Sequence, residues 1–533
     1  MMSRTRWLWC PAWALMAIAG GVCQAQGLAP APPAAQATPP PSRWPFNRNL
    51  YRPFLEAARA AEQISDPLQR CLAYPDLPGV NWTKAVTAAY CHYQFDPVVS
   101  LAEARDLIEH GKAAELDRRL GKARPAPLST LGAHDRLEGT YFTDFDDGSD
   151  DLRALLDAWK KQSPHSAYAL AASGMAYAAM AQKQRGAEVA SRTSPASFEA
   201  MSRLLTLARA DLDEAIKRDP KVTPAYSSMI YVAGLEGDRA YAAHAGEQGL
   251  ANDPANYSIY ANLVWINQPK WGGSVEAMQR LVSDAQAHAD QNPLLRLLLS
   301  QRTGGDEAIE DCNCVRVDDP RASPTAQKDF YAAAKNVYQQ LFDEAAPRLM
   351  LRSAAVSTRN HHALPLSLIY RSEEIRFSRD AIEPRILRAL DLADSGQQEW
   401  ALAEGKALVS LRPQDPDAYV ARGMAYRASG DVKQAADDLE EAVRRNPSDG
   451  WTLNALCHLY VDETHDWDKG WAATNKLLQL RPDSASGWFY RATIQKEQPR
   501  EGLDQTIADF MAKFGGDPNK QELVAHMQAM KQR

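Results

Sequence analysis

This chain of 533 residues lacks several features that mark common functional classes. It has no stripe of basic residues and its formal net charge is −7, which argues against nucleic acid as a partner. Beyond its first residues it has no apolar run near the length of about 20 residues that spans a bilayer. It also lacks the HExxH zinc-protease pattern, the GxSxG nucleophile elbow, a phosphate loop and a dinucleotide fingerprint. We therefore expect no enzyme activity, no cofactor and no metal site.

The N-terminus carries the one long apolar segment. Arg4 and Arg6 precede an apolar run over residues 7–22, and Ala25 follows where signal peptidase would cut. This pattern predicts a Sec-type signal peptide over residues 1–25 and a periplasmic or secreted protein, with an uncleaved anchor as the alternative. Residues 26–48 are rich in proline and alanine and are expected to form an extended tether. After signal cleavage we expect no stable membrane insertion.

Cysteine is scarce, with seven in the whole chain, two of which leave with the signal. In an oxidising compartment Cys71 and Cys91 are expected to form a disulfide, which closes a loop worth about 3 kcal/mol. Cys312 and Cys314 leave three alternatives open: a strained local bridge, a redox or metal pair, or free thiols. Cys457 is expected to be a buried thiol.

The chain contains a pattern with a period of 34 residues, in two separate places. One copy has the anchors Tyr419, Gly423, Tyr426, Ala435, Leu439, Ala442 and Pro447, and the other has Tyr226, Ile230, Ala233, Ala242, Gly246, Gly249 and Pro254 at the same spacing. In each copy the anchors fall on one face of two successive helices, and the small residues allow these helices to approach closely. The pattern resembles the tetratricopeptide repeat, a helix-turn-helix unit that stacks into a solenoid. It predicts an all-α fold with right-handed solenoid segments.

Proline marks the end of each unit, because it is tolerated in the first turn of a helix but not in its interior. Pro220, Pro254 and Pro293 are separated by 34 and 39 residues, whereas Pro413, Pro447 and Pro482 are separated by 34 and 35. The five extra residues of the first set coincide with residues 270–274, which predicts a lengthened turn. Gly237 and Gly430 are expected to end the first helices of their units.

These patterns divide the chain into seven segments. After the signal peptide and the tether, we expect an N-terminal helical region with the disulfide over 49–125 and a first repeat array over 126–300. A polar linker over 301–325 and a second repeat array over 326–515 follow, and a capping helix over 516–533 closes the solenoid.

The first array also resembles a bacterial domain family of uncharacterised function with tetratricopeptide-like helices. The resemblance covers Leu170 to Ala285, and the matching residues are Arg185-Gly186, Thr193, Pro195, Phe198, Met201, Asp211-Leu212, Asp219-Pro220, Trp271-Gly272-Gly273-Ser274, Glu276 and Met278. Members usually have Pro-Arg before the tryptophan, where this chain has Pro269-Lys270. Because the family has no agreed activity, the resemblance implies a fold and leaves the function open.

The Trp-Gly-Gly-Ser box of residues 271–274 permits two interpretations. Its glycines allow a positive φ or a close backbone approach, and Ser274 can cap a helix that starts at Val275. The box is then a rigid turn pinned under Trp271. Alternatively, Trp271 lies at the rim of a ligand site.

The second array offers a set of candidate partner-binding residues. Arg388, Arg422 and Arg491 occupy the same place on successive first helices, so they can form a ladder that faces an anionic partner. Packing and local ion pairing within the repeats is the alternative. Met424 and Arg427 lie nearer the expected concave face and are further candidates.

The acidic stretch from Asp144 to Asp151 does not match a calcium loop, which needs its glycine at the sixth position. If Asp144 is the first position, Gly148 is the fifth. We expect this stretch to be an exposed acidic loop.

The leading hypothesis for function is a non-catalytic exported scaffold that binds a protein or peptide in a helical groove. The alternatives are an envelope enzyme or polysaccharide-related accessory factor with a site near Trp271, and a structural spacer. A deep pocket with a carboxylate beside the Trp271 turn would favour the first alternative. The identity of the partner and the oligomeric state do not follow from the sequence.

Overall fold

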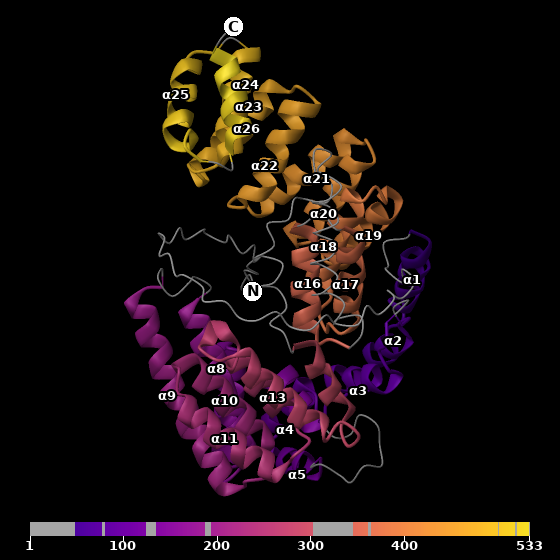
Figure 1. Ribbon diagram of the computed structural model, residues 1–533, viewed down its shortest axis with the longest axis vertical. Coiled ribbons are helices and arrows are strands. Elements are labelled where there is room, and N and C mark those ends of the chain that lie inside the picture. Colours follow the sequence, from indigo (N-terminus) through magenta and orange to yellow (C-terminus); the bar gives the residue numbers. More distant parts are fainter. Residues whose placement is uncertain are drawn as a thin grey trace, which may run out of the picture. The chain divides into compact units, whose positions relative to one another are not determined.

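The structure is a computed structural model that describes residues 48–76, 80–123, 135–186, 193–301, 345–360, 364–498, 500–517 and 520–531. Within these ranges every regular element is a helix (Figure 1). This confirms the predicted all-α class. The signal segment, nearly all of the tether and of the linker over 301–325, and the pair Cys312 and Cys314 lie outside the described residues.

The N-terminal region consists of short helices with clear caps. Asp66 accepts from the backbone of Gln69 at the start of α2, and Ser100 forms a capping box with Glu103 at the start of α4. A π-helical turn, η1, continues α6 directly. The elements are α1 (Arg48–Ala61), α2 (Pro67–Ala73), α3 (Lys84–Phe95), α4 (Leu101–Glu109), α5 (Ala113–Lys122), α6 (Arg136–Thr140), η1 (Tyr141–Phe145) and α7 (Asp150–Gln162).

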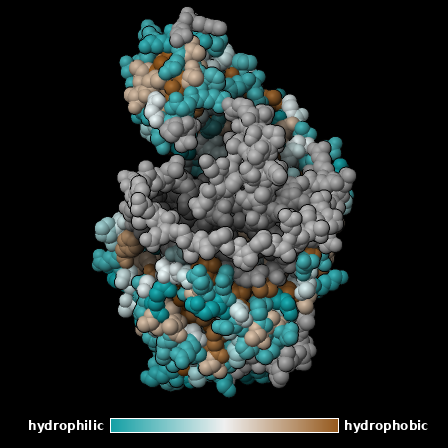
Figure 2. Space-filling view, viewed as in Figure 1, coloured by the Kyte–Doolittle hydropathy of each residue, from teal (hydrophilic) through white to brown (hydrophobic). Residues whose placement is uncertain are grey.

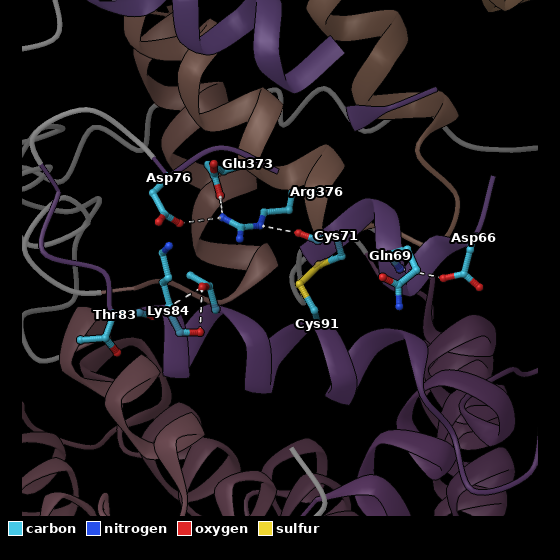
Figure 3. The surroundings of a disulfide bond; sticks show 10 residues. Asp66, Gln69, Cys71, Asp76, Thr83, Lys84, Cys91, Glu373 and Arg376 are labelled. Carbon is cyan, nitrogen blue, oxygen red and sulfur yellow. Dashed lines mark hydrogen bonds and ion pairs between the residues drawn. A yellow bond between two sulfur atoms is a disulfide. The ribbon is translucent and has the colours of Figure 1, made fainter. Parts of the chain in front are cut away.

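A disulfide joins Cys71 on α2 to Cys91 on α3, as the sequence predicts (Figure 3). Both cysteines are fully buried. The Arg376 guanidinium donates to the Cys71 carbonyl at 3.1 Å and forms an ion pair with Glu373. The covalent bond therefore fixes α3 to α2, and Arg376 ties the same point to a helix of the second array.

The first array is a stack of helix pairs. Its elements are α8 (Ala167–Arg185), α9 (Pro195–Arg218), α10 (Thr223–Glu236), α11 (Arg239–Asn252), α12 (Tyr257–Ile266), the 3₁₀ turn η3 (Pro269–Trp271), α13 (Val275–Gln286) and the 3₁₀ helix η4 (Pro293–Gln301). Gly237 ends α10 with a φ of 75°, and the Asp238 side chain then caps α11. Local turn chemistry thus ends one helix and starts the next.

Small residues set the distance between paired helices of this array. A Cβ atom on Gly174 of α8 would lie 2.6 Å from the Leu212 side chain of α9. A Cβ on Gly249 of α11 would lie 2.6 Å from Ile259 and 2.9 Å from Tyr226. A side chain at either position would force these neighbours to shift, which favours glycine there.

The lengthened turn occurs where the sequence predicts it. Helix α12 ends at Ile266, the single 3₁₀ turn η3 follows, and α13 begins at Val275 with Ser274 as its cap. Gly272 adopts a φ of 77°, and a Cβ on Gly273 would lie 2.1 Å from the Asn267 carbonyl. Both glycines are therefore required by the backbone.

The second array repeats the same pairing. Its elements are α16 (Arg348–Asn360), α17 (Leu364–Arg376), α18 (Ile382–Asp394), α19 (Gln398–Leu411), α20 (Pro416–Ala428), α21 (Val432–Arg445), α22 (Gly450–His458), the π-helical turn η5 (Leu459–Glu463), α23 (Trp467–Leu480), α24 (Ala485–Glu497), α25 (Leu503–Phe514) and α26 (Gln521–Lys531). Gly430 ends α20 with a φ of 80° and Asp431 caps α21, as in the first array. The extra residue between Pro447 and Pro482 is taken up by η5, because a π turn holds one residue more than an α turn.

An ionic cluster is buried at the start of the second array. Arg388 on α18 is 1% exposed and forms ion pairs with Glu62, the residue after α1, at 2.6 Å and with Glu404 of α19 at 2.9 Å. In α17, Arg371 pairs with Glu374 and both are buried. Because a buried charge needs a partner, the pairs of Arg388 hold the end of α1 against α18 and α19.

No described helix is both long and apolar enough to cross a membrane. The face shown in Figure 2 is mainly hydrophilic over the described residues, with hydrophobic residues scattered between. Trp271 and Trp451 are among the exposed large side chains, at 47% and 44%.

Candidate functional site

The first helices of the first array meet the N-terminal helices around a cavity of about 420 Å³. Helices α8, α10 and α12 form one wall, and α3, α6 and η1 form the other, together with the start of α16. Tyr93 of α3 and Ser258 of α12 close the two walls with a hydrogen bond of 3.0 Å between their hydroxyls. The N-terminal helices thus pack across the inner face of this array and leave a half-open cavity between the two walls.

Aromatic side chains make up much of the lining. Their rings form two contacting groups: Tyr93 lies edge-on to Tyr257 with centroids 5.7 Å apart, and Tyr231 lies 5.4 Å from Trp265. The described lining residues are Tyr90, Tyr93, Gln94, Glu138, Phe142, Asp146, Met175, Ala178, Ser227, Ser228, Tyr231, Tyr257, Ser258, Ala261, Asn262, Trp265, Gln268, Gln301, Pro347, Arg348, Leu349 and Met350.

Glu138 is a buried carboxyl at the wall of this cavity, 3% exposed. Its two oxygens accept from Asn256 at 2.9 Å and from Ser227 at 3.3 Å. Burial raises the pKa of Glu138 to about 8, and the nearby carboxylates Asp135 and Asp253 act in the same direction. At neutral pH Glu138 is therefore mainly protonated and neutral.

Asp146 is the second carboxyl of the cavity. Its side chain is accessible to solvent, but protein surrounds it within the concave lining. This desolvation raises the pKa of Asp146 to about 6, with a smaller effect from the charge of Asp147. Asp146 is therefore mainly ionised at neutral pH. Burial raises the pKa of Tyr231 to about 12, and the charge of Asp146 adds to this shift.

The acidic stretch that contains Asp146 differs from the exposed loop that the sequence predicts. Asp144 is 7% exposed and pairs with Arg379 at 2.9 Å, so this part of the prediction is wrong. Arg379 also donates to the Gln94 carbonyl of α3. The sequence does not reveal the burial of Asp144, because its partner Arg379 is distant in the chain.

The Trp271 turn lies beside the cavity. The Trp271 ring contacts Trp265, with centroids 5.5 Å apart, and Trp265 lines the cavity. Arg239 donates to the Trp271 carbonyl at 2.7 Å and to that of Ile266 at 3.3 Å, which fixes the turn. The turn is thus rigid, and it also presents an exposed ring near a pocket that holds carboxyl groups.

The predicted arginine ladder is engaged within the array. Arg388 is buried against two carboxylates, so its assignment as a partner-binding residue is wrong. Arg422 makes two hydrogen bonds to Asp438, at 2.7 and 2.6 Å. Arg491 donates to Asn475 and lies over the rings of Trp471 and Trp488. The alternative, packing and local pairing, describes these arginines.

Met424 and Arg427 have a different environment. Both are half-buried on α20. Arg427 pairs with Glu463 of η5 and contacts the His458 ring of α22 at 3.1 Å. Arg427 therefore faces α22, the first helix of the next unit. The role of Met424 and Arg427 in binding stays a prediction.

No group of three or more His, Cys, Asp or Glu side chains in the described ranges is arranged to hold a metal ion. Cys457 is buried and free, and burial raises the pKa of its thiol to about 11.

Residues 416–459 match the family model described as tetratricopeptide repeat. The chain contains a tetratricopeptide repeat. The match covers α20, α21 and α22, and the helices on either side of it pair in the same way. The resemblance of Leu170 to Ala285 to the uncharacterised domain family stays a prediction.

Solved structures with tetratricopeptide-like helices are similar to the chain at low identity. The crystal structure of yeast Tom70 shares 11% identity, with 91% of this chain and 85% of that chain covered and a TM-score of 0.32. The APC/C hetero-tetramer Cut9-Hcn1 shares 12% identity, with 91% and 95% covered and a TM-score of 0.30. No match was found among curated proteins.

Sequence reasoning missed the cavity. Its lining comes from segments between Tyr90 and Met350, and the covering helices α3 and α6 lie outside the repeat pattern. The one signal was the Trp-Gly-Gly-Ser box, which pointed to the correct turn but not to Glu138 or Asp146.

Proposed function

We propose that this protein is an exported, non-catalytic scaffold whose second array binds a protein or peptide segment. The observation that carries the proposal is a row of half-buried side chains at equivalent positions of three successive first helices. Such a row is where a tetratricopeptide-like solenoid offers a binding surface.

This row, called the inner row below, follows from the repeat register. Met424, His458 and Thr493 each come one residue after the small anchor of their helix, and the other members lie one turn before or after them. None is fully buried. The inner row comprises Met424, Arg427, Asn454, His458, Phe489, Thr493 and Lys496.

Neighbouring helices touch along this row, so it is a continuous surface. Arg427 of α20 contacts His458 of α22, and Ser486 of α24 donates to Asn454 of α22 at 2.6 Å. At its end, Phe489 of α24 lies 6.1 Å from the His526 ring of α26, between ring centroids.

The chemistry of the inner row suggests the kind of segment that it accepts. Met424 and Phe489 offer adaptable apolar contacts, while Arg427 and Lys496 carry positive charge. A peptide with apolar anchors and acidic side chains matches both. Export rests on the N-terminal signal pattern, and fractionation of cells that express the full chain tests it.

The binding proposal is tested with an array of acidic and apolar peptides probed with the mature protein. The double variant Thr493→Glu/Lys496→Glu places two negative charges on the inner row, and we expect it to lose the peptides that the wild type retains. Lys433→Glu, on the exposed side of α21, is the matched control and should bind as the wild type does.

Equal binding by all three proteins would place the surface elsewhere. Absence of any peptide binding by folded wild-type protein would contradict the scaffold proposal.

A further inference from the structure

The covered cavity of the first array is a separate site that the scaffold function does not use. We propose that it binds the end of a short neutral saccharide, whose chain leaves the cavity past Trp271. The cavity volume of about 420 Å³ falls within the range of small-molecule sites, which is about 300–1,000 Å³.

The aromatic lining supplies one half of the recognition. Pyranose rings present flat faces of C–H groups, and these pack well against aromatic rings, which bury large area at little entropic cost. Tyr257 and Tyr93 contact each other in one part of the lining, and Tyr231 and Trp265 contact each other in another. A ring-shaped ligand in the cavity therefore has aromatic surface to stack against.

Amide and hydroxyl groups supply the other half. Gln94, Ser228, Asn262 and Gln268 line the same cavity. Ser228 and Asn262 donate to the carbonyls of Pro224 and Ser227, and their side-chain oxygens can still accept. The Oε1 atom of Gln268 is buried without a hydrogen-bond partner in the described part of the chain. A purely apolar ligand would leave such groups unpaired, which is costly, whereas a polyhydroxylated ligand satisfies them.

The charges of the lining favour a neutral ligand. Asp146 and Arg348 carry opposite charges, and the buried Glu138 is neutral near pH 7. An anion would face Asp146 and the buried acids behind Glu138, and a cation would face Arg348. Because the lining carries one group of each sign, a ligand charge of either sign gains little, while the neutral hydroxyl groups of a saccharide can pair with both Asp146 and Arg348.

The exit past Trp271 follows from the row of rings. Trp265 contacts Tyr231 inside the cavity and Trp271 outside it, at centroid distances of 5.4 and 5.5 Å. Trp271 is 47% exposed and is held by the tight glycine turn and by Arg239. A second sugar unit outside the cavity therefore meets a rigid aromatic ring.

The test is isothermal titration of the mature protein with three neutral probes: cellotetraose, maltotetraose and tetra-N-acetylchitotetraose. We expect saturable binding of at least one of them. Trp271→Ala should weaken this binding about tenfold, since it removes one stacking surface. Ala261→Phe, which fills the cavity, should abolish it. Trp451→Ala, an equally exposed tryptophan in the second array, should leave it unchanged.

Circular dichroism and thermal melting establish that each variant is folded, and the exposed position of Trp271 keeps its variant informative if Ala261→Phe is unstable. Absence of binding by all three probes would overturn the proposal. So would binding that Trp271→Ala leaves unchanged, or saturable binding of tetramethylammonium or glutamate in the cavity without any saccharide. Because peptide binding is placed on the second array, loss of either activity leaves the other testable.

Discussion

The two arrays use the same helix pairing but treat their inner faces differently. In the first array α3, α6 and η1 lie across the first helices and enclose a cavity lined with aromatic rings. In the second array the equivalent positions form the inner row, whose side chains stay partly exposed. The repeat therefore determines how helices stack, while sequence outside the repeat determines what the solenoid can bind.

The largest expected loss of stability tests whether the arginines of the second array are equivalent. Arg388→Met leaves Glu62 buried without its cation and Glu404 paired with Arg385 alone, and we expect a loss of about 3–5 kcal/mol in the free energy of unfolding. Arg422→Met, whose side chain is 24% exposed against 1% for Arg388, should cost about 1–2 kcal/mol. Urea denaturation at pH 7 measures both. Equal losses would mean that burial of Arg388 has no energetic consequence.

Removal of the disulfide tests how much this bond stabilises α3, which lies across the first array. The double variant Cys71→Ser/Cys91→Ser should lose about 3 kcal/mol, since the unfolded chain regains the freedom of the closed loop. Wild-type protein in reducing buffer should denature at the same urea concentration as the variant. If oxidised wild type and variant denature together, the bond contributes nothing to the position of α3.

The two arrays differ at one equivalent position, which is Gly249 in the first array and Ala442 in the second. Gly249→Ala forces a Cβ against Ile259 and Tyr226, and overpacking of about 1–3 kcal/mol should exceed the gain in helix propensity. At the matching position of the second array, Ala442→Gly should also destabilise, by about 1 kcal/mol, because alanine fits there. Urea denaturation of both variants decides this. Stabilisation by Gly249→Ala would show that α11 can accommodate a Cβ atom at this position without overpacking.

The last comparison concerns the pH dependence of the covered cavity. The folded state binds the Glu138 proton more tightly than the unfolded chain, because burial raises its pKa from 4.5 to about 8. The contribution of Glu138 to stability is therefore greatest below about pH 4.5 and is lost as the pH rises to about 8. Within that window Glu138→Gln should remove a slope of about 1.4 kcal/mol per pH unit.

The measurement is the free energy of unfolding of wild type and Glu138→Gln at pH 5, 6, 7 and 8. The difference between the two proteins isolates Glu138 from other buried acids, such as Glu373, whose pKa burial raises to about 7. Parallel curves would mean that Glu138 is hydrated in the folded protein.

Local features of the fold were predictable from the sequence. The turns at Gly237 and Gly430 and the cap at Ser274 follow from the conformational preferences of single residues, and all three occur as predicted. The disulfide was predictable because its cysteines are close in sequence and few others compete. The repeat spacing alone predicted the pairing of helices in both arrays.

Features that depend on distant partners were not predictable. Arg388 fits the repeat register, but its partner Glu62 lies 326 residues away, just after a helix outside the repeats. The cavity has the same origin, because Tyr93 and Glu138 reach the first array from segments with no repeat pattern. Where the chain folds back on its own solenoid, spacing within the repeat carries no information about the contact.

The π-helical turn η5 has a consequence for how such arrays tolerate change in length. Because Leu459–Glu463 holds one extra residue, an insertion within a helix is confined to five residues, and α23 and α24 keep their places in the stack. The family match ends at residue 459, where this turn begins. A repeat protein can thus gain one residue in the helix that carries His458. The helices of the following units keep their positions in the stack.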